Sequence, residues 1–458
     1  MFLSIILAAG EGTRMKSKLP KVMHSICGKP LLSHVINVSK ASGIDKNIVV
    51  VGHGGNIVRE KIKENVQFVE QPVGEGVPYG TGFAVMQAKD YIEDNSCVVI
   101  LYGDTPLITS DTLTKLIEFH KKGDYEGTVL SADFNDPAGY GRIIRDNAGN
   151  VTAIVEHKDA SDEEKGIKEI NSGIYCFNGK SLKLALENLD NNNAQNEYYI
   201  TDAIKILNEL GFTIGGYKIR DNEEIAGINS RIQLAEAEKI MRKRINNKHM
   251  INGITIINPD NTYIDSEVAI ERDTIIYPGA IIEGNTRIGE DCIIGHNSRI
   301  VNCKIGDRVD IQMSTIIESK IDDDSHIGPY AYIRPNSEIG KNVKIGDFVE
   351  VKNSKVDDNS KASHLSYIGD AYVGKGVNIG CGTVFVNYDG KNKHKTIVQD
   401  NAFIGCNVNL IAPVEVEEGA YVAAGSTITD KVPKKSLSIA RARQVNKGDW
   451  VEKKGLIK

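Results

Sequence analysis

The sequence predicts two different folds in one chain of 458 residues, an α/β fold with a mostly parallel sheet followed by a parallel β-helix. Strand-like and helix-like runs alternate over residues 1–228, and from residue 251 aliphatic residues return every six positions. A chain of this length is too long for one hydrophobic core. We therefore expect an α/β domain over 1–228, a connector helix over 229–250, and a β-helix domain with a C-terminal tail over 251–458.

The first range reads as buried strands separated by helices. The strands are expected at Ser4–Ala8, Asn47–Val51, Cys97–Tyr102 and Thr128–Ala132, and the helices around Leu31–Ala41, Gly82–Ile92 and Ser110–Lys121. In open α/β sheets, ligands bind beyond the carboxyl ends of the strands. Two motifs lie at such ends.

A glycine-containing segment, Leu7–Met15, follows the first strand directly. Its glycines let backbone N–H groups approach phosphate oxygens, and Arg14 and Lys21 supply fixed positive charge for a polyphosphate. The segment has neither the G-x-x-x-x-G-K-[ST] nor the G-x-G-x-x-G spacing. An ATPase or a dehydrogenase is therefore disfavoured.

The third strand ends at Tyr102 and is followed by Gly103 and Asp104. A carboxylate at this edge suits Mg²⁺, which takes one or two protein oxygens together with substrate phosphates. The alternative is that Asp104 only caps the next turn.

Ser230 and Gln233 have the spacing of a helix-capping box, and a helix of about five turns should follow through Met250. Its face Leu234, Ala237, Met241 and Ile245 is apolar, and the rest is mostly charged. The helix is either a connector or the last helix of the first domain.

The six-residue period defines the second fold. Residues two apart in a strand face the same side, so each unit offers one large and one small inward residue before a turn. The large residues are Ile264, Ile270, Ile276, Ile282, Ile288, Ile294 and Ile300, then Ile321, Ile327, Ile333, Ile339, Ile345 and Val351, then Ile404, Leu410, Val416, Val422 and Ile428. The small ones in the first run are Thr262, Val268, Thr274, Ala280, Thr286, Cys292 and Ser298.

The period lapses over Asn353–Ile368 and is interrupted by the polar stretch Asn387–Lys395, which should project as a loop from the solenoid. His364 lies in the irregular stretch, where function can displace packing. It is the candidate general base of this domain. The tail, Lys434–Lys458, loses the period.

The bulk properties exclude several classes. A net charge of −6 does not suggest nucleic-acid binding. Seven cysteines without a CxxC pair predict free thiols and a reducing, cytoplasmic location. No run of about 18 apolar residues occurs, so no transmembrane helix and no membrane partner are expected.

With these motifs, the chain to about residue 450 resembles the bacterial family of bifunctional N-acetylglucosamine-1-phosphate uridylyltransferases/glucosamine-1-phosphate N-acetyltransferases. Further matching motifs are Gly80-Thr81-Gly82, Tyr140-Gly141-Arg142, Glu156-His157-Lys158, Asn171-Ser172-Gly173 and Gly227-Ile228-Asn229. The resemblance implies a Rossmann-like nucleotidyltransferase domain and a left-handed β-helix that assembles as a homotrimer, with acetyltransferase sites between subunits.

The implied activity has two steps. The β-helix transfers acetyl from acetyl-CoA to glucosamine-1-phosphate, and the α/β domain then transfers uridylyl from UTP to N-acetylglucosamine-1-phosphate. The products are UDP-N-acetylglucosamine, a precursor of peptidoglycan and lipopolysaccharide-type polymers, and pyrophosphate. Mg²⁺ is the implied cofactor, held by Asp104 and Asn229.

The resemblance also assigns residues of the first site. Arg14 and Lys21 stabilise the transferring phosphate. The uridine contacts are Leu7, Ala8, Gly10, Gln71, Gly80 and Thr81, the sugar contacts are Gly141, Glu156 and Asn171, and Tyr102 and Gly103 belong to the same site. The segment between Gln71 and Gly80 is longer than the family pattern. The match of Gln71 to a uridine-binding position is therefore weaker than that of Gly80 or Thr81.

In the second site, the resemblance implies that His364 takes a proton from the attacking amine and that Glu350 orients it. Positions for glucosamine-1-phosphate or the acetyl group are Arg334, Lys352, Tyr367, Asn378, Asn387, Tyr388 and Lys393, and those for acetyl-CoA are Cys381, Cys406, Ala424 and Arg441. Cys381 and Cys406 stand where the family pattern has alanine and serine.

Other functions fit only parts of the pattern. A zinc enzyme on a β-helix needs three converging histidines, but His296, His326, His364 and His394 are about 30 or more residues apart. The β-helix could serve only assembly or regulation of a nucleotidylyltransferase, or the whole chain could be a non-catalytic scaffold. The first site could also take another nucleotide, such as dTTP or GTP.

Overall fold

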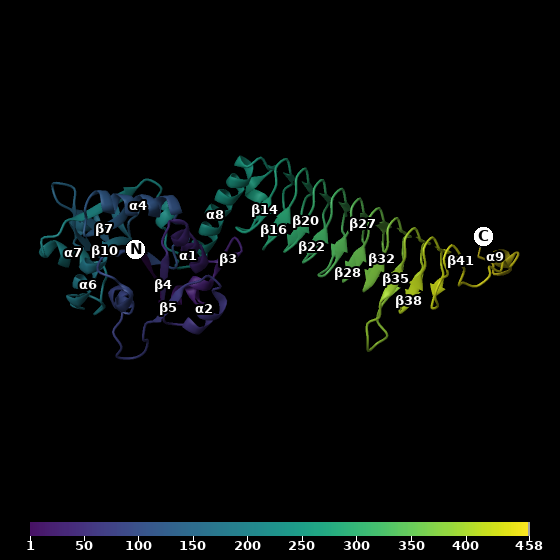
Figure 1. Ribbon diagram of the computed structural model, residues 1–458, viewed down its shortest axis with the longest axis horizontal. Coiled ribbons are helices and arrows are strands. Elements are labelled where there is room, and N and C mark those ends of the chain that lie inside the picture. The colour runs from purple at the N-terminus through teal and green to yellow at the C-terminus, as the bar shows by residue number, and fades with distance from the viewer. Residues whose placement is uncertain (457–458) are drawn as a thin grey trace. The chain divides into compact units, whose positions relative to one another are not determined.

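The computed structural model describes residues 1–456, which form two compact units, one over Met1–Met241 and one that begins at Arg242. The first contains a nine-stranded sheet covered by helices, and most of the second consists of short strands wound into a solenoid (Figure 1).

The strands of the first unit run in the order β11-β7-β10-β6-β1-β4-β5, with the hairpin β8–β9 attached to β10. Their bounds are β1 (Phe2–Ala8), β4 (Lys46–Val51), β5 (Gln67–Glu70), β6 (Cys97–Tyr102), β7 (Gly127–Asp133), β8 (Arg142–Arg145), β9 (Val151–Val155), β10 (Glu169–Asn178) and β11 (Ile214–Ile219), with a separate pair of β2 (Ser25–Ile26) and β3 (Lys29–Pro30). All neighbours on the main path are parallel except β10, which is antiparallel to β6 and β7.

Helices cover both faces of this sheet, and β1 shows why. Leu3, Ile5 and Leu7 face one buried core cluster, while Ile6 and Ala8 face another. A strand buried on both faces reads as a continuous apolar run. The helices are α1 (Leu31–Ala41), α2 (Gly55–Lys61), α3 (Thr81–Met86), α4 (Ser110–Lys122), α5 (Asp162–Lys165), α6 (Gly179–Glu187) and α7 (Asp202–Glu209).

The four predicted strands and the helices α1 and α4 are confirmed to within two residues. The helix expected over Gly82–Ile92 was too long, because α3 ends at Met86 and a separate 3₁₀ turn spans Lys89–Tyr91. Both conformations have nearly the same apolar spacing, so the pattern did not separate them.

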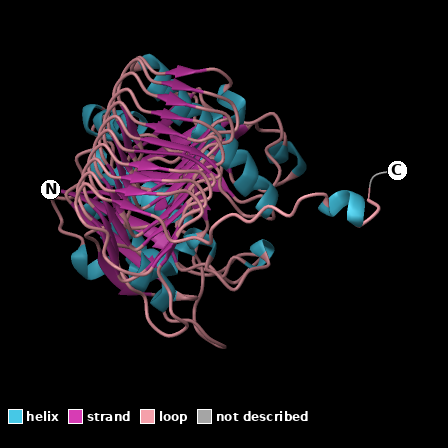
Figure 2. Ribbon diagram, turned by 90° about the vertical axis from the view of Figure 1, so that its right-hand side faces the viewer, coloured by secondary structure: helices cyan, strands magenta, loops and turns pink. Residues whose placement is uncertain are grey.

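The second unit is a left-handed parallel β-helix whose strands form three parallel sheets, so each coil contributes one strand to each sheet (Figure 2). The first sheet contains β12 (Thr255–Ile256), β15 (Ile275–Ile276), β18 (Ile293–Ile294), β21 (Asp310–Ile311), β24 (His326–Ile327), β27 (Lys344–Asp347), β30 (Lys361–His364), β33 (Asn378–Ile379), β36 (Phe403–Ile404), β39 (Tyr421–Val422) and β41 (Leu437–Ser438). The second contains β13 (Tyr263–Ile264), β16 (Ile281–Glu283), β19 (Arg299–Val301), β22 (Thr315–Ile317), β25 (Tyr332–Ile333), β28 (Glu350–Lys352), β31 (Tyr367–Gly369), β34 (Val384–Val386), β37 (Asn409–Ile411) and β40 (Thr427–Ile428). The third contains β14 (Ala269–Ile270), β17 (Arg287–Ile288), β20 (Lys304–Ile305), β23 (Lys320–Ile321), β26 (Glu338–Ile339), β29 (Lys355–Val356), β32 (Ala371–Val373), β35 (Thr396–Val398) and β38 (Val414–Val416).

The six-residue period is confirmed, because every large and small residue predicted to point inward is buried. Ile264 pairs with Ile282 in the next coil, whereas Ile288 pairs with Ile305. The coil from Ile288 to Ile305 is one residue shorter than the coil from Ile264 to Ile282. The predicted six-residue frame therefore shifts by one position after Ile300. The stacked aliphatic residues form one continuous core along the solenoid.

The predicted loop is also present. Val373 pairs with Val398, so this coil contains the extra chain between β34 and β35. Within the loop, His394 bonds the Asp389 carboxylate at 2.7 Å. The tail contains one short helix, α9 (Trp450–Lys453).

The expected connector is one continuous helix, α8 (Arg231–Ile251). The Ser230 hydroxyl accepts from the Gln233 N–H at 3.3 Å, and the Gln233 side chain reaches back to the Asn229 N–H at 2.8 Å. Its first half packs in the first unit through Ala237, and Asn246 is buried against the start of the β-helix, where it donates to the Pro259 and Thr262 carbonyls. Over the described residues, no helix is long and apolar enough to cross a membrane.

The β-helix core predicts that two neighbouring isoleucines contribute very differently to the free energy of unfolding. Ile294 is fully buried and Ile293 is 36% exposed. Ile294→Ala should reduce the free energy of unfolding by about 2–5 kcal/mol, because it leaves a cavity in a core that cannot collapse. The measurement is the denaturant midpoint of the full chain followed by circular dichroism. Ile293→Ala is the matched control, and equal shifts in both variants would contradict the inward assignment.

Candidate active sites

A pocket of about 320 Å³ lies at the carboxyl ends of β1 and β6 and beside the start of α3. Its lining includes ten of the predicted residues, Leu7, Ala8, Gly10, Lys21, Gln71, Gly80, Thr81, Tyr102, Asp104 and Asn229. Ten further residues to which no role was assigned from the sequence also line it, namely Ala9, Val22, Tyr79, Ala84, Thr105, Tyr140, Ser172, Glu197, Ile225 and Gly227. Tyr140, Ser172 and Gly227 lie within the matched motifs, so the motif spacing could have identified them.

The loop after β1 depends on a glycine. Gly12 has φ +68°, and a Cβ there would lie 2.7 Å from the Lys21 Cβ. The chain therefore closes tightly onto the segment that carries Lys21. Arg14, on the same loop, is exposed and does not line the pocket.

Lys21 connects the two predicted metal ligands. Its ammonium forms an ion pair with the Asp104 carboxylate and donates to the Asn229 side-chain oxygen at 2.9 Å. The side chains of Lys21 and Asp104 are only 16% and 12% exposed. Two oxygens that converge on one cationic nitrogen are a suitable donor set for a hard divalent cation.

Asn229 is brought to Asp104 by backbone bonds. The Ile228 N–H donates to the Asp104 carbonyl at 3.0 Å, and the Asn229 N–H is held by Gln233 of the α8 cap. The cap of α8 thus positions a predicted metal ligand, although these residues are about 125 positions apart in the sequence.

Gly103 packs tightly below the pocket, where its N–H donates to the Leu7 carbonyl at 2.9 Å. Burial raises the pKa of the Tyr102 hydroxyl, with a further contribution from Glu156. This hydroxyl is therefore a neutral hydrogen-bonding group at physiological pH.

The predicted sugar residues lie together beside this pocket, without lining it. The Asn171 N–H donates to the Gly141 carbonyl at 2.9 Å, and a Cβ on Gly141 would lie 3.5 Å from a Glu156 oxygen. Glu156 lines a second pocket of about 730 Å³ with Asp159, Asp190 and Asp202. Burial raises the pKa of Glu156 above its ordinary range.

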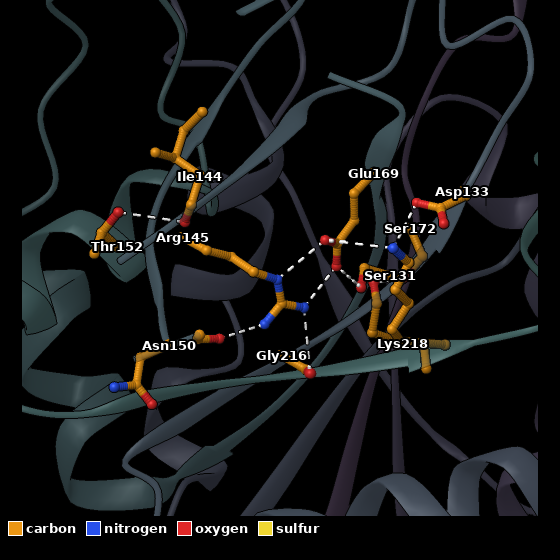
Figure 3. Close-up of polar contacts among 12 residues, drawn as sticks. Ser131, Asp133, Ile144, Arg145, Asn150, Thr152, Glu169, Ser172, Gly216 and Lys218 are labelled. Carbon is orange, nitrogen blue, oxygen red and sulfur yellow. Dashed lines mark hydrogen bonds and ion pairs between the residues drawn. The ribbon is translucent and has the colours of Figure 1, made fainter. Parts of the chain in front are cut away.

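Gly141 and Glu156 flank the β8–β9 hairpin, and a polar network attaches that hairpin to the rest of the sheet (Figure 3). The Arg145 guanidinium of β8 forms two bonds with Glu169 of β10, at 3.0 and 2.6 Å. Ser131 of β7 also donates to Glu169 at 2.6 Å, and Lys218 of β11 pairs with Asp133 at 2.7 Å. Bidentate Arg–carboxylate pairs constrain orientation, so this network sets the position of the hairpin.

In the second unit, His364 lies at the end of β30, and its partner is not the expected carboxylate. His364 Nδ1 bonds Asp347 at 2.6 Å, because Asp347 is its register neighbour in the preceding coil. Glu350, expected to orient His364, instead forms an ion pair with Arg334 at 2.7 Å. Asp347 was not predicted from the sequence. Its position 17 residues before His364, about one coil, is the signal that could have identified it.

Three cationic side chains, Arg334, Lys352 and Lys393, lie close together on the β-helix. The side-chain contact with Lys352, the charge of Lys352 and the charge of Arg334 all lower the pKa of Lys393. Asp370, also missed from the sequence, binds Lys352 at 3.1 Å and accepts a bond from Asn387. Asn387 donates to the Tyr367 hydroxyl at 3.3 Å. Crowded cations of this kind suit a phosphate group.

The remaining predicted residues follow the coils. Ile379 of β33 pairs with Ile404 of β36, which pairs with Val422 of β39. Cys381, Cys406 and Ala424 lie two positions after these residues and so occupy equivalent corners of successive coils. The Arg441 guanidinium donates to the Ala424 carbonyl at 3.0 Å. Asn378 begins β33, and Tyr388 is exposed on the projecting loop.

A zinc site on the β-helix has no support. Among residues 1–456, the one group of three or more ligand side chains close enough to share an ion is Cys97, His120 and Cys176. This group is buried in the first unit, at the amino end of β6, whereas Asp104 follows its carboxyl end.

Comparisons with known proteins cover the whole chain. Residues 3–215 match the family model for nucleotidyl transferases. Residues 267–302, 318–353 and 395–430 match the model for the bacterial transferase hexapeptide of six repeats.

Curated relatives match at nearly full length. The chain is 59% identical over 453 residues to the bifunctional protein GlmU of Clostridioides difficile strain 630, which covers 99% of this chain and 98% of that protein. It is 58% identical over 457 residues to that of Acetivibrio thermocellus, covering 100% and 98% of the two chains. Identity to that of Clostridium acetobutylicum is 54% over 457 residues, covering 99% of each.

The acidic second pocket predicts a pH-dependent stability. Burial, with the charge of Asp190, raises the pKa of Asp202 to about 6 from an ordinary value of 3.8. The folded state therefore disfavours the charged form, and this destabilisation is present above pH 6 and disappears as the pH falls towards 4. Asp202→Asn should raise the thermal unfolding midpoint at pH 8, and the gain should vanish near pH 4.

The matched control is Asp162→Asn, since Asp162 also begins a helix but its side chain is fully exposed. It should show no comparable gain at pH 8. An equal midpoint for Asp202→Asn and the unchanged protein at pH 8 would contradict the assignment.

Proposed function

Because the chain belongs to the family of bifunctional GlmU proteins, we propose that it makes UDP-N-acetylglucosamine in two steps on two separate sites. It is a transferase with a nucleotidyltransferase domain and a hexapeptide-repeat acyltransferase domain. The observation that carries the two-site proposal is the presence of one constellation in the first unit, Lys21–Asp104–Asn229, and of the Asp347–His364 pair and the cationic residues Arg334, Lys352 and Lys393 in the second.

In the first site, we assign the substrates UTP and N-acetylglucosamine-1-phosphate. The sugar phosphate attacks the α-phosphorus and pyrophosphate leaves, so negative charge grows on the phosphate oxygens. Lys21 is placed to neutralise this charge, and Arg14 on the exposed loop can add to it when the substrate binds. No general base is required, because a sugar phosphate is already ionised near neutral pH.

Asp104 and Asn229 are the residues that would hold Mg²⁺, because their oxygens already converge on a cation. When bound, the ion neutralises phosphate charge and orients the triphosphate. Gly141, Glu156 and Asn171 are assigned to the sugar, and the remaining predicted pocket residues to the nucleotide.

In the second site, the substrates assigned are glucosamine-1-phosphate and acetyl-CoA. His364 donates from Nδ1 to the Asp347 carboxylate, which fixes Nε2 as the nitrogen that accepts a proton. Nε2 takes that proton from the amine as the amine adds to the thioester carbonyl. Arg334, Lys352 and Lys393 bind the phosphate. We assign the orienting role to Asp347, while Glu350 holds Arg334 in place.

We also assign a trimeric assembly, supported by an apolar stripe on the His364 face. The stripe consists of Met313, Tyr330, Phe348 and Leu365, which are 38–57% exposed and all have positive φ. The Tyr330 and Phe348 rings stack at 5.3 Å. Exposed apolar patches mark interaction surfaces, and bulky residues are unfavourable in this backbone region. We also assign a cytoplasmic location, supported by seven cysteines that are all free.

The two sites should be separable by single substitutions. Asp104→Ala should lower uridylyl transfer by about 100-fold or more, because it removes a ligand and the partner of Lys21. His364→Ala should lower acetyl transfer by about 10²–10⁴-fold, because the proton acceptor is lost. Pyrophosphate release and free CoA thiol are measured separately.

Each variant is the control for the other. Asp104→Ala should retain acetyl transfer, and His364→Ala should retain uridylyl transfer. Loss of both activities in one folded variant would contradict the division into two sites, and normal acetyl transfer in His364→Ala would remove His364 as the base.

The apolar stripe predicts which surface of the β-helix lies in the trimer interface. Phe348→Glu should shift the protein from trimer to smaller species, because a buried charge is costly at an apolar interface. It should lose acetyl transfer and keep uridylyl transfer. The mass is measured by light scattering after size exclusion, with Phe348→Leu as the conservative control. An unchanged mass for Phe348→Glu would exclude this stripe from the interface.

A further inference from the structure

Two thiols occupy the corner of the β-helix next to His364. Ala362 of β30 pairs with Ile379, and Ile379 pairs with Ile404. His364, Cys381 and Cys406 each lie two residues further on, so they occupy equivalent corners of three successive coils. The Asn407 N–H donates to the Cys381 carbonyl at 2.7 Å, which confirms that the two cysteine corners are in contact through their backbones.

These two thiols differ from the other five in accessibility. All seven cysteines are free, but Cys406 is exposed and Cys381 is partly exposed, whereas the others are buried. Neither thiol is buried in a core, and neither forms a disulfide. Neighbouring strands lie about 4.7–4.9 Å apart, and this spacing falls within the Cα separation that a disulfide requires. Successive coils are therefore close enough for the Cα separation of a disulfide between equivalent corners.

The pair also lies where sulfur chemistry is expected. This step rests on the proposed function, since the thioester of acetyl-CoA must approach the amine that gives its proton to His364. Cys381 is one coil from His364, and Cys406 is two. A ligand that positions the CoA sulfur for acetyl transfer therefore brings that sulfur close to a protein thiol.

We propose that Cys381 and Cys406 form a modification site for CoA disulfide, the oxidised form of the product thiol. A thiolate of the pair attacks one sulfur of CoA disulfide, which gives a protein–CoA mixed disulfide and releases one CoA thiolate. The second cysteine then attacks the protein sulfur of that mixed disulfide. This step forms the Cys381–Cys406 disulfide and releases the second CoA thiolate.

The exchange is balanced without another reagent. The two protein thiols are oxidised, one CoA disulfide is reduced to two CoA thiols, and the two protons are released to solvent or carried by the product thiols. Either modified state places sulfur-linked groups in the path of the acetyl donor. Acetyl transfer therefore stops when the CoA pool is oxidised and resumes on reduction, while uridylyl transfer on the first unit continues.

The test uses the full-length protein incubated with CoA disulfide, followed by intact-mass measurement and peptide mapping. We expect a CoA adduct or an internal disulfide at Cys381 and Cys406, with loss of acetyl transfer in proportion to the modified fraction. Dithiothreitol should restore the activity. Cystine, which exchanges by the same chemistry but lacks the nucleotide, should react more slowly, and saturating acetyl-CoA should protect the pair.

Substitutions identify the order of the two steps. Cys381→Ala and Cys406→Ser, each compared with its own untreated rate, should be unable to form the internal disulfide. At least one of the two variants should accumulate the CoA adduct. Cys303→Ala, at a fully buried cysteine, is the matched control and should react as the unchanged protein does.

The outcomes separate this proposal from the proposed function. Normal acetyl transfer in the untreated protein, with no modification at either cysteine, would overturn the modification site alone. Equal reaction with cystine and CoA disulfide would overturn recognition of the CoA part. An untreated, folded protein without acetyl transfer would overturn the proposed function instead.

Discussion

The structure of the second unit depends on one constraint, the in-register stacking of parallel coils. Each inward aliphatic residue must lie on its equivalent in the next coil, since that is the only way these short strands can bury a core. The same constraint aligns whatever occupies the corners. Asp347 therefore meets His364, 17 positions further along the chain, and the apolar residues Tyr330 and Phe348 meet as stacked rings.

Stacking also explains how one solenoid holds separate chemical groups close together. An acid–base pair, a cluster of cations and two accessible thiols lie on coils that follow one another. A substitution at one corner therefore has its first effect on the corner above or below it. The long loop between β34 and β35 adds Asn387 and Lys393 to this surface without disturbing the stack, because it leaves and re-enters the coil at fixed strand positions.

In the first unit, charged and polar side chains are concentrated at one edge of a sheet. Lys21, Asp104 and Asn229 come from three distant segments, and a backbone bond between Ile228 and Asp104 brings two of these segments together. The Lys21 ammonium compensates the buried Asp104 carboxylate, which would otherwise be costly to bury. In the α8 cap, Gln233 holds Asn229 at this edge. The sugar side depends on a second polar network, centred on Glu169, which attaches the β8–β9 hairpin.

The sequence by itself determined the periodic parts of the protein. The six-residue repeat, the four leading strands, the connector helix and the projecting loop are local patterns of burial, and they were recognisable without coordinates. The motifs also identified Lys21, Asp104 and Asn229, which converge as expected. The sequence could not decide which carboxylate reaches His364, because Asp347 and Glu350 are three residues apart and only the coil register selects one. Nor could it show that Asp370 joins Lys352 to Asn387, or that Cys381 and Cys406 share neighbouring corners. These pairings are set by the exact length of each coil, and that length is decided by how the whole stack packs.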